Sequence, residues 1–253
     1  SSVCGFSPNR TMGLAQKLYE GVDLGKGSII GLITYMRTDS VNVSQEARDA
    51  AKDFIVKTHG AEFYPAKPNI YRSRASAQEA HEAIRPTDVN CTPESLRSIL
   101  DPPALKLYDL IWRRFIASQM ASANIEQRTA IITSAPPPAQ QHSYKFTATA
   151  SEVTFPGFLK VMELDIRKTK ASEGDENGDD DEIAKLPPLQ IGEQLDLLEW
   201  LNERKETKPP SRYTEAALIK ALEANGVGRP STYASIIETL VSRTYVTREK
   251  RAL

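Results

Sequence analysis

The sequence has few cysteines and no long apolar run, and each shortage excludes a class of protein. Only two cysteines occur among the 253 residues, and the separation of Cys4 and Cys91 fits no metal-binding spacing. Two such thiols suit a reduced intracellular protein better than a disulfide-stabilised secreted one. No apolar run approaches the roughly 18 residues of a membrane span, and no signal peptide stands at the start. We therefore expect a cytoplasmic protein without membrane segments.

Acidic charge is concentrated in one short segment. The net charge is −1, but residues 171–182 hold seven acidic and no basic residues, so the rest of the chain carries +6. We expect this segment to be a solvated, disordered loop. A metal-binding acidic loop is the alternative, but the segment lacks the ordered alternation of ligands that such a loop needs. Residues 201–253 carry +4, which favours DNA binding over a purely structural scaffold.

The apolar periodicity predicts a multidomain α+β protein with three parts. We expect a helical domain over 1–121, a partial β-rich domain over 122–200 and a partial helical domain over 201–253. The predicted helices cover 11–20, 45–58 with Ser44 as N-cap, 103–118, Thr214 to about Ala224, and Ser231 to about Arg243. The predicted strands cover 29–36, 127–134, 144–150 and 191–200. These strands are too few to close a barrel or sandwich, so partner strands are expected outside this chain.

The most informative segment is residues 31–40, Gly-Leu-Ile-Thr-Tyr-Met-Arg-Thr-Asp-Ser. Side chains alternate faces in an extended segment, so Tyr35 and Arg37 are expected to point the same way. A free tyrosine side chain has a pKa near 10, so forming the phenolate at pH 7 costs roughly 4 kcal/mol. A neighbouring arginine favours the phenolate and stabilises charge on a phosphate. The pair thus suits attack on a phosphodiester.

This segment resembles the active-site tyrosine motif of bacterial type IA DNA topoisomerases. Methionine at position 36 favours the topoisomerase I branch, because a proline there indicates topoisomerase III. The resemblance implies that Tyr35 attacks one DNA strand and holds its 5′ phosphate covalently. Arg37 then stabilises the phosphate, and Thr34, Arg37 and Thr38 are candidate DNA contacts.

A second string, residues 78–88, reads Gln-Glu-Ala-His-Glu-Ala-Ile-Arg-Pro-Thr-Asp and resembles the second motif of the same family. By this resemblance, His81 binds the scissile phosphate or transfers a proton as a partner of the tyrosine. A lone histidine is otherwise more often structural. Two roles remain open for Arg85, which either reaches DNA or pairs with Glu79 or Glu82.

A third string, residues 226–235, reads Gly-Val-Gly-Arg-Pro-Ser-Thr-Tyr-Ala-Ser. A capped helix N-terminus with open N–H groups and a nearby arginine forms an anion site, although a plain N-cap has the same pattern. The string resembles the family's third conserved block, with Thr244 at a position where a glycine often stands. The resemblance implies that four residues grip the backbone of a single strand: Arg229, Ser231, Thr232 and Arg243.

Taken together, the resemblance implies an isomerase that cleaves one strand, passes a strand through the gap, reseals and relaxes negative supercoils. The family binds Mg²⁺ through a Toprim domain, whose acidic pattern this sequence lacks, and no zinc ribbon occurs. We therefore expect a central fragment, monomeric and nucleoid-associated, that holds no metal and does not relax DNA alone. Its partner is single-stranded or negatively supercoiled DNA. The alternatives are a single-strand binding module and a structural scaffold; a tyrosine recombinase fits less well.

Overall fold

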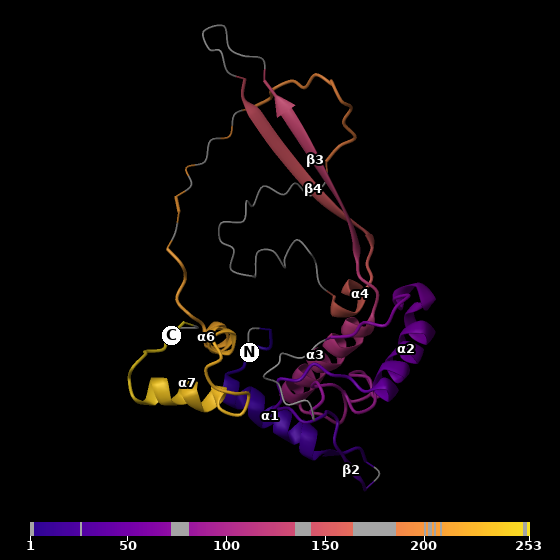
Figure 1. Cartoon of the computed structure of the whole chain (residues 1–253), viewed down its shortest axis with the longest axis vertical. Helices are drawn as coiled ribbons and strands as arrows, with labels where there is room; N and C mark the ends of the chain where they lie inside the picture. The colour runs from indigo at the N-terminus through magenta and orange to yellow at the C-terminus, as the bar shows by residue number, and fades with distance from the viewer. Residues whose placement is uncertain are drawn as a thin grey trace. The chain divides into compact units, whose positions relative to one another are not determined.

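The computed structural model describes residues 3–25, 27–71, 81–134, 143–163, 186–199, 201, 204, 206–207, 209–249 and 252–253 (Figure 1). The acidic segment 171–182 lies outside the described residues, so its predicted disorder stays a prediction. Contacts within the chain define two compact units: residues 1–121 together with 210–253, and residues 122–209. Helices dominate the first unit and an antiparallel ribbon the second, which confirms the α+β class. The three-domain division stays a prediction.

Three long helices form the first unit, and local signals set their ends. Helix α1 covers Pro8–Glu20, helix α2 Gln45–His59 and helix α3 Pro102–Gln119. Ser7, Ser44 and Asp101 are the N-caps, each with a side chain that accepts a hydrogen bond from a backbone N–H of the first turn. All three predicted helices are therefore confirmed. Helix α1 begins three residues earlier than predicted, because a proline at N1 starts it.

The core of the unit lies between the facing stripes of these helices. The buried side chains are Leu14, Ala15 and Leu18 of α1, Ala47, Ala51 and Ile55 of α2, and Leu107, Tyr108, Trp112, Phe115 and Ile116 of α3. Phe54 of α2 is half-buried and meets the ring of Trp112 edge-on, with ring centroids 5.4 Å apart. After α2 the chain forms a short 3-10 helix, η1, over Ala61–Phe63.

A small hairpin joins α1 to the Tyr35 segment. Strand β1, Val22–Asp23, pairs antiparallel with strand β2, Ile29–Ile30, and Gly25 and Gly27 stand between the two strands in the sequence. The predicted strand over 29–36 is wrong beyond residue 30. Only one isolated bridge follows, between Ile33 and Pro86, and the backbone bends at residues 34, 36 and 37. This segment pairs with a distant piece of chain rather than with a strand next to it.

Two shorter helices complete the first unit. Helix α6, Glu215–Ala224, is capped by Thr214, as predicted. Helix α7 covers Tyr233–Ser242, and its N-cap is Thr232, not Ser231 as predicted. Helix α7 lies against α1, where Asn9 Nδ2 donates to Glu238 Oε2 at 3.0 Å.

The second unit is built on one long ribbon. Strand β3, Asn124–Thr133, pairs antiparallel with strand β4, Lys145–Phe155, and both are longer than predicted. Most side chains of both strands are exposed, and the location of further partner strands stays a prediction. A short helix, α4, follows at Leu159–Met162. The predicted strand over 191–200 is wrong, since residues 191–199 contain none. Among the described residues, no helix is long and apolar enough to cross a membrane.

Candidate active site around Tyr35

The Tyr35 segment leaves the core at a defined point. Leu32 and Ile33 are 2% and 1% exposed, and the Leu32 N–H donates to the Leu18 carbonyl of α1 at 2.7 Å. Tyr35 is then 41% exposed, while Met36 is buried at 4%. Arg37 is exposed again. Tyr35 and Arg37 thus both reach solvent on either side of a buried methionine, although the segment is bent rather than a strand.

Two rings pack against the exposed Tyr35 ring. The His81 ring lies 5.8 Å away, centroid to centroid, at an interplanar angle of 71°. The Tyr19 ring of α1 lies 5.4 Å away at 67°. Both are edge-to-face contacts, which orient a ring without covering all of it. The structure therefore brings together Tyr35 and His81, which are 46 positions apart in the sequence.

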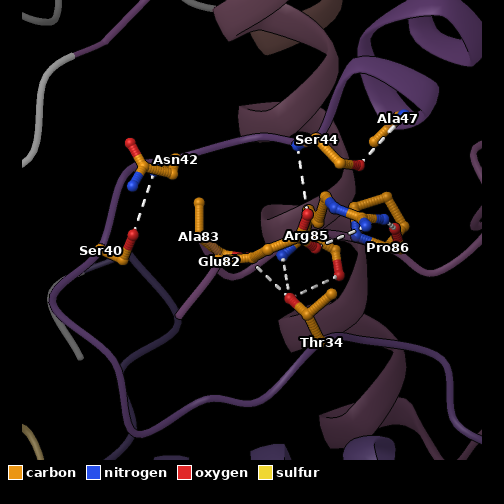
Figure 2. Close-up of polar contacts among 9 residues, drawn as sticks. All are labelled: Thr34, Ser40, Asn42, Ser44, Ala47, Glu82, Ala83, Arg85 and Pro86. Carbon is orange, nitrogen blue, oxygen red and sulfur yellow. Dashed lines mark hydrogen bonds and ion pairs between the residues drawn. The ribbon is translucent and has the colours of Figure 1, made fainter. Parts of the chain in front are cut away.

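Thr34 connects the Tyr35 segment to the segment that follows His81 (Figure 2). Its hydroxyl donates to the Ala83 carbonyl at 2.7 Å and accepts from the Arg85 N–H at 2.9 Å. Its own N–H donates to the Arg85 carbonyl at 2.9 Å. Thr34 was a candidate DNA contact, and here its hydroxyl is engaged within the chain. A DNA contact by this hydroxyl stays a prediction.

A second set of bonds joins the same segment to the start of α2 (Figure 2). The Ser44 N–H donates to Glu82 Oε1 at 3.2 Å, and the Ala83 N–H donates to the Asn42 carbonyl at 2.8 Å. The Ser44 hydroxyl meanwhile caps α2 by accepting from the Ala47 N–H at 3.3 Å. Residues 82 and 83 therefore bond to the chain after Tyr35, at Asn42 and Ser44, and Ala83 also bonds to the chain before it, at Thr34.

Arg85 pairs within the protein, which was one of its two expected roles. Its Nη2 donates to Glu82 Oε2 at 2.6 Å, and its Nη1 donates to the Pro86 carbonyl at 3.1 Å. The side chain is only 14% exposed. Both terminal nitrogens are thus used inside the chain, so the structure favours the pairing over a DNA contact. Glu79, the other expected partner, lies outside the described residues.

Arg37 and Thr38 differ in whether their side chains form contacts within the described part of the chain. Within the described residues, Arg37 makes no ion pair, ring contact or side-chain hydrogen bond. The Thr38 hydroxyl accepts from the Ser40 N–H at 3.0 Å and so shapes the turn that follows. An unpaired, exposed guanidinium two residues from Tyr35 can turn toward a phosphate without breaking a contact.

Helix α3 holds the chain that follows the His81 string. The Tyr108 hydroxyl donates to the Cys91 carbonyl at 2.6 Å, and Trp112 Nε1 donates to the Val89 carbonyl at 3.0 Å. Burial raises the pKa of the Tyr108 hydroxyl, and the nearby Cys91 raises it further by a smaller amount. Burial likewise raises the pKa of the Cys91 thiol. Both groups stay neutral at physiological pH, and the Tyr108 hydroxyl fixes this loop through its bond to the Cys91 carbonyl.

The Gly226–Ser235 string is less open than predicted. The N–H groups of Thr232 and Tyr233 both donate to the Arg229 carbonyl, at 2.8 and 3.1 Å. The Thr232 hydroxyl accepts from the Arg229 N–H at 2.9 Å. The expected anion site at this helix start therefore has two of its N–H groups already used. Ser231 lies exposed in the turn.

Arg229 and Arg243 lie at opposite ends of α7, and both are exposed. A ten-residue helix is about 15 Å long. The two guanidinium groups therefore suit different phosphates of one strand rather than the same one. Helix α1 connects this region to the tyrosine, since Asn9 contacts α7 and Tyr19 contacts Tyr35.

The described residues contain no cluster of side chains that could form a binding site for Mg²⁺. No group of three or more His, Cys, Asp or Glu side chains lies together anywhere in the described part of the chain. Glu82, the acidic residue next to His81, has both oxygens engaged by Ser44 and Arg85.

Two features of the site were missed from the sequence. No local sequence pattern indicates that the Tyr19 ring contacts Tyr35, because this contact depends on how α1 packs. The bond from the Ser44 N–H to Glu82 joins residues 38 positions apart and is equally invisible in a local pattern. The three-residue spacing of Glu82 and Arg85, in contrast, is a local signal for an ion pair.

Comparison with known proteins identifies the family of this chain. The family described as DNA topoisomerase matches residues 1–253. The DNA topoisomerase 1 of Xylella fastidiosa is 46% identical over 256 residues, and that of Helicobacter pylori 41% identical over 254. Each alignment covers all of this chain but only 30% and 31% of the relative, so the chain spans about a third of their length.

The solved structure of full-length topoisomerase I from Thermotoga maritima matches 98% of this chain with a TM-score of 0.79 and 36% identity, over 36% of that protein. The relatives' shared name agrees with the branch that Met36 indicated. The match also extends well beyond the three strings, over the whole sequence. The chain therefore belongs to the type IA DNA topoisomerase family.

Proposed function

We propose that this chain carries the tyrosine of a DNA topoisomerase I that cleaves one DNA strand, passes a strand through the gap, reseals and relaxes negative supercoils. The observation that carries the proposal is the exposed Tyr35 ring with the His81 ring packed against it. Family membership supports the reaction class. Because the chain spans about a third of its relatives' length, the complete reaction belongs to the full-length parent enzyme.

In the proposed cleavage step, Tyr35 Oη attacks the phosphorus of a phosphodiester. A bond forms between Oη and phosphorus, and the bond from phosphorus to the 3′ oxygen breaks. The phenol gives up its proton, and the leaving 3′ oxygen gains one to become a free hydroxyl. The 5′ phosphate stays on the tyrosine, and the reverse reaction reseals the strand. No free energy is lost to hydrolysis, because one phosphodiester replaces another.

The neighbouring side chains have distinct roles in this step. His81 binds the phosphate or relays the proton, since its ring lies against the Tyr35 ring. Arg37 stabilises charge on the phosphate oxygens. A guanidinium about 4 Å from a phosphate contributes roughly 4 kcal/mol at an effective dielectric of 20. Mg²⁺ in the parent enzyme is expected to be bound by residues beyond those described here.

Substitution of Tyr35 tests this function directly. In the full-length parent enzyme, Tyr35→Phe removes the nucleophile, so we expect no covalent adduct with labelled single-stranded DNA on a denaturing gel. The matched control is Tyr19→Phe, which makes the same change in the ring beside Tyr35 and keeps the edge-to-face contact. We expect adduct in this control within about twofold of wild type. An adduct that persists in Tyr35→Phe contradicts the assignment.

A second candidate function is single-strand DNA binding by the 253-residue chain itself, without relaxation. The observation that favours it is the pair of exposed arginines, Arg229 and Arg243, at the two ends of α7. Such contacts position a backbone without reading its sequence and weaken with salt. Relaxation of supercoiled DNA by this chain alone contradicts the restriction to binding.

A further inference from the structure

The loop that carries Tyr35 is closed at both ends by one short segment. We call residues 34–44 the tyrosine loop and residues 82–86 the clamp segment. At the start of the loop, the Thr34 N–H donates to the Arg85 carbonyl, while the Thr34 hydroxyl accepts from the Arg85 N–H and donates to the Ala83 carbonyl. At its end, the clamp segment bonds to Asn42 and Ser44. The nucleophile thus sits on a loop whose two ends share one anchor (Figure 2).

The Glu82–Arg85 ion pair links the two anchored ends. One carboxylate oxygen of Glu82 accepts from the Ser44 N–H at the end of the loop, and the other accepts from Arg85 Nη2. The backbone of Arg85 in turn holds Thr34 at the start of the loop. Bonds to charged groups are stronger than neutral ones, and low exposure of Arg85 reduces screening of the pair.

We propose that Glu82 and Arg85 are positioning residues that hold the Tyr35 ring against the His81 ring in the geometry that DNA cleavage requires. His81 directly precedes Glu82, so the ion pair that fixes the loop also fixes the backbone that carries the histidine. Among the described residues, neither side chain forms a hydrogen bond, ion pair or ring contact with Tyr35. A displacement of about 1 Å at a reacting group slows a reaction about 100-fold. The kinetic consequence rests on the proposed function, whereas the geometric claim does not.

Glu82→Gln and Arg85→Gln perturb the clamp with little change of shape. In Glu82→Gln, one amide oxygen replaces two carboxylate oxygens, so either the Ser44 bond or the Arg85 bond is lost whichever way the amide turns. Arg85→Gln removes the charge and its bond to the Pro86 carbonyl. The matched control is Asp109→Asn, which breaks a comparable ion pair between Asp109 and Arg113 on α3, at 2.7 Å and similar exposure.

The first experiment measures single-turnover adduct formation by the full-length parent enzyme at saturating single-stranded DNA. We expect Glu82→Gln and Arg85→Gln each to slow it about 10- to 100-fold, as misplacement of a reacting group does, with the DNA Kd within about twofold of wild type. The double variant is expected to be no slower than the worse single one, because both changes break the same pair. Asp109→Asn is expected to react at the wild-type rate.

Three outcomes overturn the proposal: single variants that react within twofold of wild type, a loss that appears entirely in the DNA Kd, or an equal loss in Asp109→Asn. The last points to general destabilisation rather than positioning. Thermal unfolding of each variant, followed by circular dichroism, separates a folded but slow enzyme from an unfolded one.

The second experiment measures the geometry without catalysis. In full-length enzyme labelled with ¹³C at histidine Cε1, the Tyr35 ring shifts the His81 signal, which is assigned by its loss in His81→Ala. We expect Glu82→Gln to move this signal toward the position it takes in Tyr35→Leu, which removes the ring. A His81 signal unchanged by Glu82→Gln overturns the proposal. If the wild-type enzyme forms no adduct, the proposed function fails, while this measurement still decides the positioning.

Discussion

The tyrosine loop and the segment from Gly226 to Thr244 both carry predicted DNA-binding residues, but opposite kinds of contact hold them. The loop is held by hydrogen bonds that span about 50 positions, such as Thr34 to Ala83 and Thr34 to Arg85. In the Gly226–Thr244 segment, one bond reaches Asn9 of α1, but most bonds span three to five positions, such as Arg229 to Thr232 and Ser235 to Thr239. The loop takes its shape from a distant partner, whereas the second segment takes its shape from its own sequence.

This difference has a functional consequence. A nucleophile must be held near its partner groups to within a fraction of an ångström, which long-range anchors at both ends of a loop provide. A backbone-gripping segment needs less accuracy, since a phosphate contact tolerates movement along the strand. Exposed arginines on a segment held mostly by local hydrogen bonds suffice for that purpose. The predictions below test how far this contrast holds.

The largest expected effect comes from removing one threonine hydroxyl from the tyrosine loop, compared with removing one from the Gly226–Thr244 segment. Thr34→Val leaves the Arg85 N–H and the Ala83 carbonyl without their partner in a half-buried place, so we expect a loss of about 1–3 kcal/mol in the free energy of unfolding. Thr239→Val removes an exposed hydroxyl that bonds only to the Ser235 carbonyl one turn away. We expect it to cost less than about 0.5 kcal/mol, because water replaces the bond.

Urea denaturation of the 253-residue chain measures both changes. Valine keeps the branched shape of threonine in each case, so the difference between the variants reports the hydroxyl alone. Equal losses in the two variants contradict the contrast between long-range and local support.

The same contrast explains which parts were predictable from the sequence. Ser44 and Thr214 are local signals, and the helix starts that they predicted are observed. The irregular path after Ile30 was not predictable, because the bridge from Ile33 to Pro86 depends on a segment some 50 positions away. A short apolar run there indicated a strand, but Leu32 and Ile33 are consecutive buried residues that anchor the segment in the core.

The candidate site was predictable only as a set of residue types. Tyr35 and His81 were each identified from their strings, and the structure adds that their rings touch. The two possible roles of Arg85 could not be separated, because the choice depends on where Glu82 lies. The cap at Ser231 was wrong by one residue, since Thr232 turns its hydroxyl back to the Arg229 N–H. Both residue types are favoured at an N-cap, serine slightly more than threonine, so capping preference points to Ser231 and only the backbone geometry places Thr232 there.

A smaller effect, on the salt dependence of DNA binding, is expected from Arg229, an exposed arginine of the Gly226–Thr244 segment. Arg229→Ala in the 253-residue chain removes one phosphate contact, so the slope of log K against log salt for single-stranded DNA becomes less steep by about 0.7. Fluorescence anisotropy of a labelled oligonucleotide over a salt series measures it. The control is Arg248→Ala, because Arg248 is ion-paired with Glu215. A slope that changes equally in both variants, or in neither, contradicts the assignment of Arg229.

The smallest effect concerns the two helix ends within the second segment, which share one geometry but not one residue type. At the end of α6, the Val227 N–H bonds to the Leu222 carbonyl and the Gly226 N–H to the Glu223 carbonyl, with Gly226 at φ 68°. At the end of α7, Tyr245 and Thr244 repeat this pattern, with Thr244 at φ 57°. Both are Schellman motifs, but only one has the glycine that the left-handed position favours.

Thr244→Gly is therefore expected to stabilise the chain. A non-glycine residue in the left-handed region costs about 1–2 kcal/mol, and the greater freedom of glycine in the unfolded chain returns about 0.5–1 kcal/mol of that. The net gain is expected to be about 0.5–1 kcal/mol in urea denaturation. The reciprocal control is Gly226→Ala, where a Cβ meets no atom within 4 Å, so only backbone strain opposes it. We expect this variant to lose a similar amount. If Thr244→Gly is neutral while Gly226→Ala destabilises, the Thr244 side chain contributes a stabilising contact that offsets its strain.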